Sequence, residues 1–421
     1  MSKPTPASSA SSARAFKWHV DVEKHVVTWN FERRGWLKTD GDDWNIYWAS
    51  KVSVKALFNP ENGVRLVDGQ YVNHFPNHYE LTRKDLMVKN IKRYKRDAVA
   101  TSTDATSLDF LPTTYTLPAD YSLFVEEFRR NPNTMWIMKP SSKAQGKGIF
   151  IVNKLSQTKK WATQNQRWAA PNASAASGST TTPAVKEGYV VSRYIENPLL
   201  IGGKKFDLRM YVLVLSYRPL QALVYREGFA RFCNVKYSAD VDAMDNPFVH
   251  LTNVAVQKNN EEYNSNHGGK WNIKNLLLYV EATRGRGSGD KLLADIHAVM
   301  LHSLRAVQHV IINDHHCFEC YGYDIIVDDT LKPWLVEVNA SPSLTTTTTD
   351  DRNMKSRLLR DVLELVVVND APDTKRALPQ TPTVGVTNGF SWLLNEAATL
   401  ETDRQRLEAQ KKQRKTSAQW R

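Results

Sequence analysis

The stretch PWLVEVNASPSL, residues 333–344, decides the fold of this chain. Its apolar residues between Trp334 and Val338 predict a β-strand that enters a hydrophobic core, yet Glu337 and Asn339 interrupt the pattern. An ionised carboxylate is costly to bury unless a positive charge lies beside it. We therefore expect a cation next to Glu337.

The position of this strand in a hairpin predicts what Glu337 faces. Side chains alternate along a strand, so Glu337 and Asn339 project to the same side, about 6.6 Å apart. The preceding segment YGYDIIVDDTLKPW ends in turn-forming residues, which indicates an antiparallel hairpin. A turn centred between Thr330 and Leu331 places Asp324 opposite Glu337, with Cβ atoms about 5 Å apart.

Two carboxylates at that separation repel each other, and one becomes protonated unless a cation lies between them. Asp, Glu and Asn side chains offer hard oxygen ligands, which suit Mg²⁺ better than Zn²⁺. We therefore predict a magnesium site formed by Asp324, Glu337 and Asn339. Two alternatives stay open: an acidic patch that faces solvent beside the turn, and a hairpin register shifted by one residue.

Proteins usually hold Mg²⁺ with few side chains together with a nucleotide, so phosphate-binding segments are expected elsewhere. The segment KPSSKAQGKGIF places Lys139 at the end of a predicted strand, and a glycine-bounded loop at 145–148 follows. Glycines let backbone N–H groups approach phosphate oxygens. The loop is not a Walker A motif, because Gly148 stands where Ser or Thr is required. A flexible surface loop is the alternative.

A second charged segment, KKFDLRMYV, places Lys205, Asp207 and Arg209 on one face of a predicted strand, opposite apolar residues. These charges either belong to the same polar site or face solvent. The H-R-D and D-F-G motifs of protein kinases are absent from the sequence.

Several long segments, in a constant order along the chain, resemble the tubulin tyrosine ligase-like family, and most of all its short polyglutamylase-type members. They are VNHFPNHYELTRKDLMVKNIKRY, WIMKPSSKAQGKGIF, NPLLIGGKKFDLRMYVLV, YREGFARF, HLTNVAVQK, HGGKW, CFECYGYDIIVDDTLKPWLVEVNASPSL and TDDRNMK. The resemblance covers about residues 16–370. It implies an α+β fold with an ATP-grasp-type core, in which antiparallel sheets hold the nucleotide between them, and a smaller N-terminal α/β lobe.

The domain boundaries that we expect combine this resemblance with composition. The segments are a disordered Ser/Ala/Pro-rich start (1–15), an N-terminal lobe (16–130), a central lobe with a nucleotide-covering loop (131–200) that carries a mobile insertion (near 163–187), a C-terminal ATP-grasp lobe with the metal-binding hairpin (201–370), and a linker with a basic tail (371–421).

The resemblance also implies roles for individual residues. For ATP it implies Lys139, Gln145, Gly146, Ser192, Arg193, Tyr194, Ile195, Lys205, Asp207, Thr252 and Asn253. For Mg²⁺ it implies Asp324, Glu337 and Asn339, the same set that the hairpin predicts. For the incoming glutamate it implies Arg226, Lys270 and, as a weaker candidate, Lys355, and for catalysis Arg209 at the phosphoryl end together with Arg226. Residues 192–195 match a hinge whose backbone receives adenine. Many relatives carry Arg at position 145 and Gln at position 192, so loop contacts are less certain and the base is expected to be read mainly by the backbone.

The activity implied by the resemblance is an ATP-dependent ligase that adds glutamate to γ-carboxylates in the C-terminal tails of tubulin, through an acylphosphate. Its implied cofactors are ATP and Mg²⁺, and its partners are tubulin or microtubules, free glutamate and accessory targeting subunits. Its implied location is the cytoplasm and cytoskeleton, including the axoneme and basal body of cilia or flagella. The alternatives are a tubulin glycine ligase, a glutamate ligase for another protein, and an inactive microtubule-binding scaffold.

Composition agrees with an acidic partner. The net charge is +12 and the isoelectric point is near 9.4, although a generic basic surface is the alternative. The sequence shows no helix-turn-helix, zinc-finger or RNP pattern, no apolar run of about 18 residues and no secretory signal, so we expect neither nucleic acid nor a membrane as partner. Its three cysteines suit a reducing compartment, and the CFEC pair is expected on a buried strand rather than at zinc.

Overall fold

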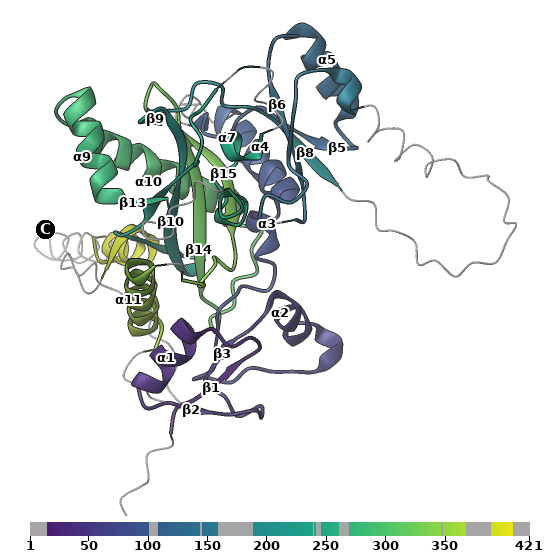
Figure 1. Cartoon of the computed structure of the whole chain (residues 1–421). Coiled ribbons are helices and arrows are strands. Elements are labelled where there is room, and N and C mark those ends of the chain that lie inside the picture. Colours follow the sequence, from purple (N-terminus) through teal and green to yellow (C-terminus); the bar gives the residue numbers. More distant parts are fainter. Residues whose placement is uncertain are drawn as a thin grey trace, which may run out of the picture.

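The computed structural model describes residues 15–100, 108–143, 145–158, 188–238, 240, 246–260, 269–346, 348–367 and 389–406. The predicted insertion near 163–187 and nearly all of the predicted disordered start lie outside these residues. Within them the chain forms a parallel sheet and two antiparallel sheets, which helices cover (Figure 1). None of the helices in these ranges combines the length and the apolar character that crossing a bilayer requires.

The N-terminal lobe is a small parallel sheet with helices, in the strand order β2-β1-β3-β4. Its elements are β1 (Lys17–Val20), α1 (His25–Arg33), β2 (Leu37–Lys38), β3 (Ile46–Trp48), α2 (Lys51–Leu57), η1 (Pro60–Asn62) and β4 (Tyr71–Val72). Apolar residues spaced along one side of α1, among them Val27 and Phe31, pack against Trp18 and Trp36. The predicted small α/β lobe is confirmed.

The second sheet is antiparallel, in the order β5-β8-β6-β7. It consists of β5 (Thr114–Leu117), β6 (Trp136–Pro140), β7 (Phe150–Val152) and β8 (Tyr189–Arg193), with α5 (Tyr121–Arg130) against it. Phe124 and Phe128 of α5 are buried on Trp136, as their helical spacing predicts. The predicted boundary at residue 130 divides this unit, because β5 pairs with β8 rather than with the N-terminal sheet.

The central sheet is antiparallel and has the order β13-β12-β10-β11-β16, with β14 between β10 and β15. Its strands are β9 (Leu200–Ile201), β10 (Lys204–Tyr217), β11 (Leu220–Tyr225), β12 (Phe229–Phe232), β13 (Lys270–Asn272), β14 (Glu319–Val327), β15 (Pro333–Asn339) and β16 (Phe390–Asn395). Nearly every residue of β10 is buried, because helices cover both faces of the sheet.

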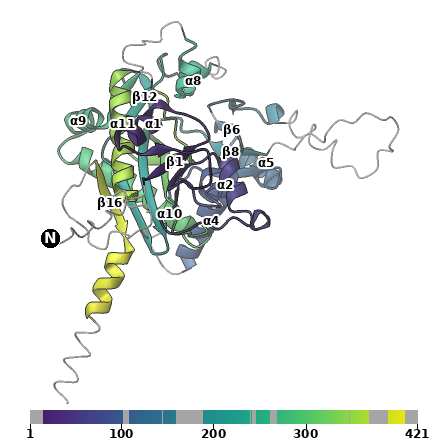
Figure 2. The same cartoon turned by 90° about the horizontal axis from the view of Figure 1, so that it is seen from below.

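Alternate residues of β10 feed two hydrophobic clusters, one on each face. The remaining helices are α3 (Tyr79–Thr82), α4 (Lys84–Ala100), α7 (Pro247–His250), α8 (Val254–Gln257), α9 (Ile273–Arg284), α10 (Ser288–Val307) and α11 (Thr349–Val366). Met210 and Val212 belong to the cluster that includes α4, α9 and α10, whereas Tyr211 and Leu213 belong to the cluster that includes α1 and α11. Figures 1 and 2 both show α1 beside α11.

The strand β16 overturns part of one prediction. Residues 371–421 are predicted to be a linker and a tail, but β16 pairs with β11 at the edge of the central sheet. Phe390 is buried, with its ring centroid 4.9 Å from that of Tyr225. Residues 396–406 are helical, and the rest of the predicted basic tail lies outside the described residues.

The hairpin of β14 and β15 pairs Asp324 with Glu337, as predicted. The register nearer the turn differs, because Ile325 pairs with Leu335 and a bulge takes up the extra residue of β15. The bulge breaks the predicted alternation, and Leu335 and Val338 therefore contact the same hydrophobic cluster.

Candidate active site

A cleft of about 1070 Å³ lies between the β5-β8-β6-β7 sheet and the central sheet. Its lining includes every residue predicted to contact ATP: Lys139, Gln145, Gly146, Ser192, Arg193, Tyr194, Ile195, Lys205, Asp207, Thr252 and Asn253. Asp324 and Glu337 lie in the same lining. Residues from six segments that are distant in the sequence thus line one hollow.

The predicted hinge lies at the end of β8, where the chain leaves the sheet. The N–H groups of Arg193 and Tyr194 donate to the carbonyl oxygens of Thr113 and Met135, at 2.8 Å and 2.9 Å. The Ser192 hydroxyl accepts a hydrogen bond from Thr114 at 2.9 Å. Ile195, the last residue of the predicted hinge, also lines the cleft.

Two lysines supply positive charge to the cleft from opposite sheets, Lys139 from β6 and Lys205 from β10. Burial lowers the pKa of Lys139 to about 8 and also lowers the pKa of Lys205. Lys205 donates to the Tyr194 hydroxyl at 2.8 Å and lies 4.3 Å from the centroid of that ring. Neither ammonium forms an ion pair with a carboxylate of the described residues, so both can serve an anionic ligand.

The loop at 145–148 lies over the cleft in a conformation that requires glycine. Gly146 has φ of 77°, and a Cβ there would lie 3.1 Å from both Asn253 Oδ1 and Val256 Cγ2. This close approach brings the loop against the start of α8. Gln145 also has a positive φ, of 65°, which is uncommon for a residue with a side chain.

Neighbouring strands of the central sheet place four charged residues in a buried network. Asp324 accepts two hydrogen bonds from Arg209, at 2.6 Å and 3.0 Å, and lies 2.9 Å from Arg231. Arg231 also donates to Asp207, at 2.8 Å and 2.5 Å. Burial raises the pKa of Asp324, but the two guanidinium groups outweigh burial and hold it well below its usual value. Asp324 therefore stays ionised, and the alternative that these charges face solvent is wrong.

The cation beside Glu337 is Lys84, whose Nζ lies 2.9 Å from Oε2. Lys84 is the first residue of α4 and is buried next to the hairpin, where the sequence led us to expect a metal ion rather than a lysine. The amide nitrogen of Asn339 lies 3.3 Å from Glu337 Oε1 and 3.5 Å from Asp324 Oδ2. The three predicted metal ligands thus converge.

Their donor chemistry fits a hard divalent cation. Two carboxylates and a side-chain amide meet, and the amide can present its oxygen after a 180° rotation. Arg209, Arg231 and Lys84 neutralise these carboxylates in the structure described here. A metal ion would take over part of that neutralisation and leave the cations able to contact another anion.

A second cavity, of about 1250 Å³, adjoins the first and shares Gln145, Asn253 and Glu337 with it. Its lining is rich in cations: Arg209, Arg231, Lys258, Lys270 and Lys355. Asp351 accepts from both Lys270 and Lys355 at 3.1 Å, while Lys355 also donates to the Thr345 carbonyl at 2.6 Å. Burial lowers the pKa of Lys270, and that of Lys355 to about 8. Such a cavity suits a small molecule with more than one carboxylate.

The structure does not bring Arg226 to this cavity. Arg226 is exposed where β11 turns into β12, and its Nε donates to the Gly389 carbonyl at 3.4 Å. Arg231, from the same YREGFARF segment, lies at the expected place instead. Sequence reasoning missed both Arg231 and Lys84. The available signal was that each lies within a segment that carries the family resemblance.

Comparison with known proteins agrees with this geometry. The chain matches the model of the tubulin-tyrosine ligase family over residues 64–375. It is 48% identical over 403 residues to the probable alpha-tubulin polyglutamylase Ttll1 of Tetrahymena thermophila, covering 92% of this chain and 94% of that protein. It is 42% identical over 371 residues to the probable tubulin polyglutamylase ttll-9 of Caenorhabditis elegans, covering 88% and 82%. It is 44% identical over 368 residues to the probable tubulin polyglutamylase TTLL9 of Bos taurus, covering 82% and 77%.

Proposed function

Because this chain belongs to the tubulin-tyrosine ligase family, we propose that it is an ATP-dependent ligase that adds glutamate to γ-carboxylates in the C-terminal tails of tubulin. The observation that carries the proposal is the meeting of two cavities at the hairpin: Glu337 lines both, while Asp324 lines the first and Asn339 lines the second. One cavity has the lining predicted for ATP, and the other is lined by cations that suit a dicarboxylate. The polyglutamylase names of its relatives support tubulin as the acceptor.

ATP binds in the first cavity, with adenine at residues 192–195 and phosphates between Lys139 and Lys205. The two ammonium groups lie on different sheets, so they contact the phosphate chain from both sides. The loop at 145–148 presents backbone N–H groups over the phosphates, where Gly146 permits close approach. These residues orient the nucleotide with its terminal phosphate towards the carboxylates of the hairpin.

Asp324, Glu337 and Asn339 would hold Mg²⁺, which when bound offsets the negative charge of the phosphates. The acceptor carboxylate attacks the terminal phosphorus of ATP and ADP leaves, which yields an acylphosphate. Arg209 and Lys84 lie beside the hairpin carboxylates and stabilise negative charge on the transferred oxygens.

The second cavity positions the incoming glutamate. Arg231, Lys270 and Lys355 provide cations for its two carboxylates, which leaves the amine directed at the acylphosphate. The amine attacks the carbonyl carbon, loses a proton, and the phosphate departs as the amide bond forms. Positioning of this kind removes on the order of 7 kcal/mol of barrier at best. Glycine has a single carboxylate and would leave part of this cation set unpaired.

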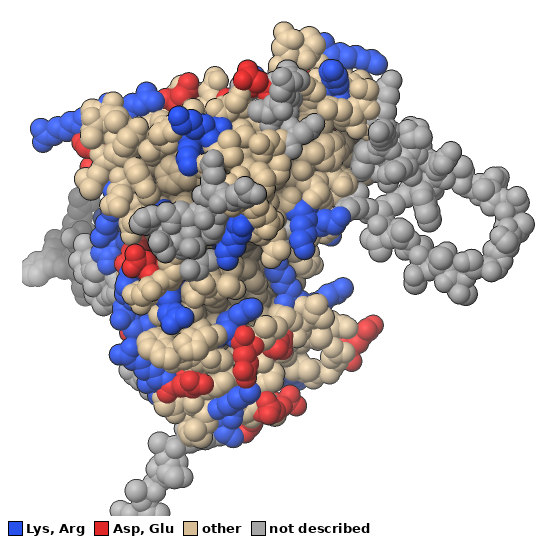
Figure 3. All heavy atoms as spheres, viewed as in Figure 1, with Lys and Arg blue, Asp and Glu red and all other residues tan. Residues whose placement is uncertain are grey.

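The acceptor is an acidic, flexible peptide, which a basic protein attracts over distance. A third cavity, of about 1340 Å³, lies between the N-terminal lobe and the central sheet, and Lys24 and Lys51 are in its lining. It shares Gln145 and Ser341 with the cation-rich cavity, and is the route by which we expect the tail to enter. Figure 3 shows Lys and Arg side chains along the side of the molecule where α11 and α1 lie.

Two finer proposals concern where and with what the enzyme acts. We place it at microtubules, including axonemes and basal bodies, and we expect accessory subunits to target it there. Efficient modification of microtubules by the purified chain alone would contradict the need for those subunits.

The test is incorporation of labelled glutamate into tubulin with ATP and Mg²⁺, by the purified chain and by complexes isolated from cells through a tag on it. We expect labelled tails whose mass rises in steps of one glutamate residue, and no competition by excess glycine. Incorporation of glycine in preference to glutamate, or no incorporation by either preparation, would overturn the proposal.

A further inference from the structure

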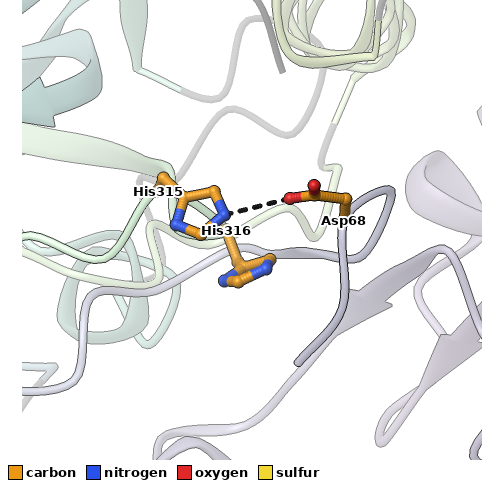
Figure 4. A group of neighbouring side chains, drawn as sticks. All are labelled: Asp68, His315 and His316. Atoms are coloured by element: carbon orange, nitrogen blue, oxygen red, sulfur yellow. Dashed lines mark hydrogen bonds and ion pairs between the residues drawn. The ribbon is translucent and has the colours of Figure 1, made fainter. Parts of the chain in front are cut away.

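A separate group of metal-ligating side chains lies where the N-terminal lobe meets the central sheet. Asp68 comes from the turn before β4, and His315 and His316 come from the loop before β14. One ligand atom from each residue lies within 4.8 Å of the others (Figure 4). None of these residues lines the cavities assigned above to ATP, glutamate or the acceptor.

The backbone holds the two loops together. Val72 donates to the His316 carbonyl at 2.9 Å, and Phe318 donates to the Val72 carbonyl at 3.0 Å. The turn that carries Asp68 is closed by the Gln70 N–H, which donates to the Val67 carbonyl at 3.1 Å. The positions of the three side chains are therefore set by paired backbone rather than by loose loops.

His316 is prepared to act as a ligand. Its Nδ1 lies 2.7 Å from Asp314 Oδ1, which fixes the proton on that nitrogen and leaves the lone pair on Nε2. The Nε2 atom is buried and has no hydrogen-bond partner within the described part of the chain, and His316 as a whole is 7% exposed. A carboxylate behind a histidine is the arrangement that orients imidazole towards a metal ion. A buried ring nitrogen without a partner is otherwise costly.

His315 and Asp68 form the accessible side of the group. His315 Nε2 lies 3.4 Å from Asp68 Oδ1, and the His315 ring centroid is 3.8 Å from that of His316. Both side chains are about half exposed, at 53% and 55%, so an ion can enter from solvent. Their exposed side chains can rotate to bring the ligand atoms to the bond lengths of about 2.0–2.2 Å that zinc requires.

We propose that Asp68, His315 and His316 bind a divalent transition-metal ion of the zinc class, with water completing its coordination. Two imidazoles and one carboxylate suit zinc and its neighbours rather than Mg²⁺. The ion ties the N-terminal lobe to the loop that leads into β14, the strand that carries Asp324.

The other histidine group at this junction, His74, His78 and Glu319, is a poorer candidate. Both ring nitrogens of His74 are already engaged, Nδ1 with Glu319 at 2.9 Å and Nε2 with Ser341 at 3.2 Å. Nδ1 of His78 contacts the Phe75 carbonyl at 3.1 Å. These hydrogen bonds occupy both nitrogens of His74 and Nδ1 of His78 without a metal ion.

The test uses the full chain in excess Mg²⁺ and ATP, which occupy the hard-ligand site, and titrates it with Zn²⁺ against a chromophoric chelator and with Co²⁺ by visible absorption. We expect one ion per chain, a Co²⁺ spectrum without thiolate charge transfer, and affinity reduced at least about tenfold by Asp68→Asn and by His315→Gln. Both substitutions are at exposed side chains, so the fold should survive them.

His309→Gln changes another exposed histidine, six residues before His315 in the sequence, and should leave affinity unchanged. Asp314→Asn should weaken binding about 10–100-fold through the orientation of His316 alone. Absence of stoichiometric Zn²⁺ binding, or equal affinity in wild type and in the Asp68→Asn/His315→Gln double variant, would overturn the proposal. The result does not depend on whether the chain is a glutamate ligase.

Discussion

Glu319 and Asp324 lie on the same strand, β14, and both carboxyl groups are buried, yet their charges differ. Burial raises the pKa of Glu319 to about 7, and burial lowers the pKa of its partner His74 to about 3. At Asp324, burial acts in the same direction but Arg209 and Arg231 outweigh it, so the pKa lies well below its usual value. The pKa values of the two carboxyl groups therefore move in opposite directions because Asp324 contacts two guanidinium groups, which Glu319 does not.

This difference distinguishes the buried contact of Glu319 with His74, which has a structural role, from the candidate active site around Asp324. At Glu319 one histidine and the Phe75 N–H complete the hydrogen bonds, and a single proton shared with His74 removes the charge. At Asp324 two guanidinium groups keep the charge in place and are themselves held in the cleft. A site that keeps buried charges ionised can exchange their partners for a metal ion and a phosphate, whereas a neutralised pair cannot.

The largest expected effect comes from Asp324→Asn, which removes the shared negative charge of Arg209 and Arg231. We expect glutamate incorporation to fall by on the order of 10³-fold, because the proposed metal site loses a ligand and two buried cations are left unbalanced. Glu319→Gln on the same strand should keep activity within about threefold, since Glu319 is outside the three cavities and burial already raises its pKa to about 7. Equal losses in the two variants would remove the distinction between the two regions.

The next effect concerns the two arginines of the YREGFARF segment. Arg231→Met should reduce kcat/KM for glutamate by about 10²-fold, because Arg231 lines the cation-rich cavity and contacts Asp207 and Asp324. Arg226→Met is the matched control, with an expected change below about threefold, since Arg226 is exposed outside that cavity. The reverse order would return the glutamate-binding role to Arg226, where the family resemblance first placed it.

A stability measurement tests the buried contact of Glu319 with His74 and the Phe75 N–H. Glu319→Ala should lower the free energy of unfolding by about 3–5 kcal/mol, because it leaves His74 Nδ1 buried without its hydrogen-bond partner and the Phe75 N–H buried without an acceptor. Glu227→Ala breaks a more exposed ion pair with Arg357 and should cost less than about 1 kcal/mol. Chemical denaturation of both variants at pH 7 measures the two free energies of unfolding. Similar losses in the two variants would mean that the buried Glu319–His74 contact stabilises the fold no more than the exposed ion pair does.

The smallest expected effect is a change in how the free energy of unfolding depends on pH. Between pH 4.5 and 6.5 the unfolded chain carries one proton on His74, and the folded pair carries one on Glu319, so the pair adds no slope to wild-type stability. In Glu319→Gln the folded state lacks that proton. Acidification from pH 6.5 to 5 should then destabilise the variant relative to wild type by about 1.4 kcal/mol per pH unit. Parallel stability curves would contradict the proton sharing.

The two strands of the hairpin could be predicted from the sequence, and the family resemblance named residues that line the cleft between the two antiparallel sheets. The predicted turn between Thr330 and Leu331 paired Asp324 with Glu337, although the strands next to the turn pair one residue out of that register. The bulge beside that pair was not predictable, since the packing of Leu335 and Val338 into one cluster depends on helices that cover the sheet. Without the bulge, the register beside the turn would place Asp324 opposite Val336, so the bulge is what brings Asp324 opposite Glu337.

The partners of the buried charges could not be predicted from the sequence. Lys84 reaches Glu337 from a helix in a distant part of the chain, and only tertiary packing brings them together. Arg231 faces Asp207 because β12 pairs with β10 in one particular register, which the sequence of either strand alone does not specify. The strand β16 was missed because a Pro/Thr-rich segment before it resembles a linker, although Phe390, Trp392 and Leu394 alternate as a strand requires.

The most direct measurement compares Glu337→Gln with Glu319→Gln in one assay of labelled glutamate, ATP, Mg²⁺ and tubulin, after confirming that both variants fold. If Glu337 holds the metal ion as we propose, Glu337→Gln should lower incorporation by at least about 10²-fold, while Glu319→Gln should remain close to wild type. Incorporation by Glu337→Gln within a few-fold of wild type would contradict the assignment of ligase chemistry to this site.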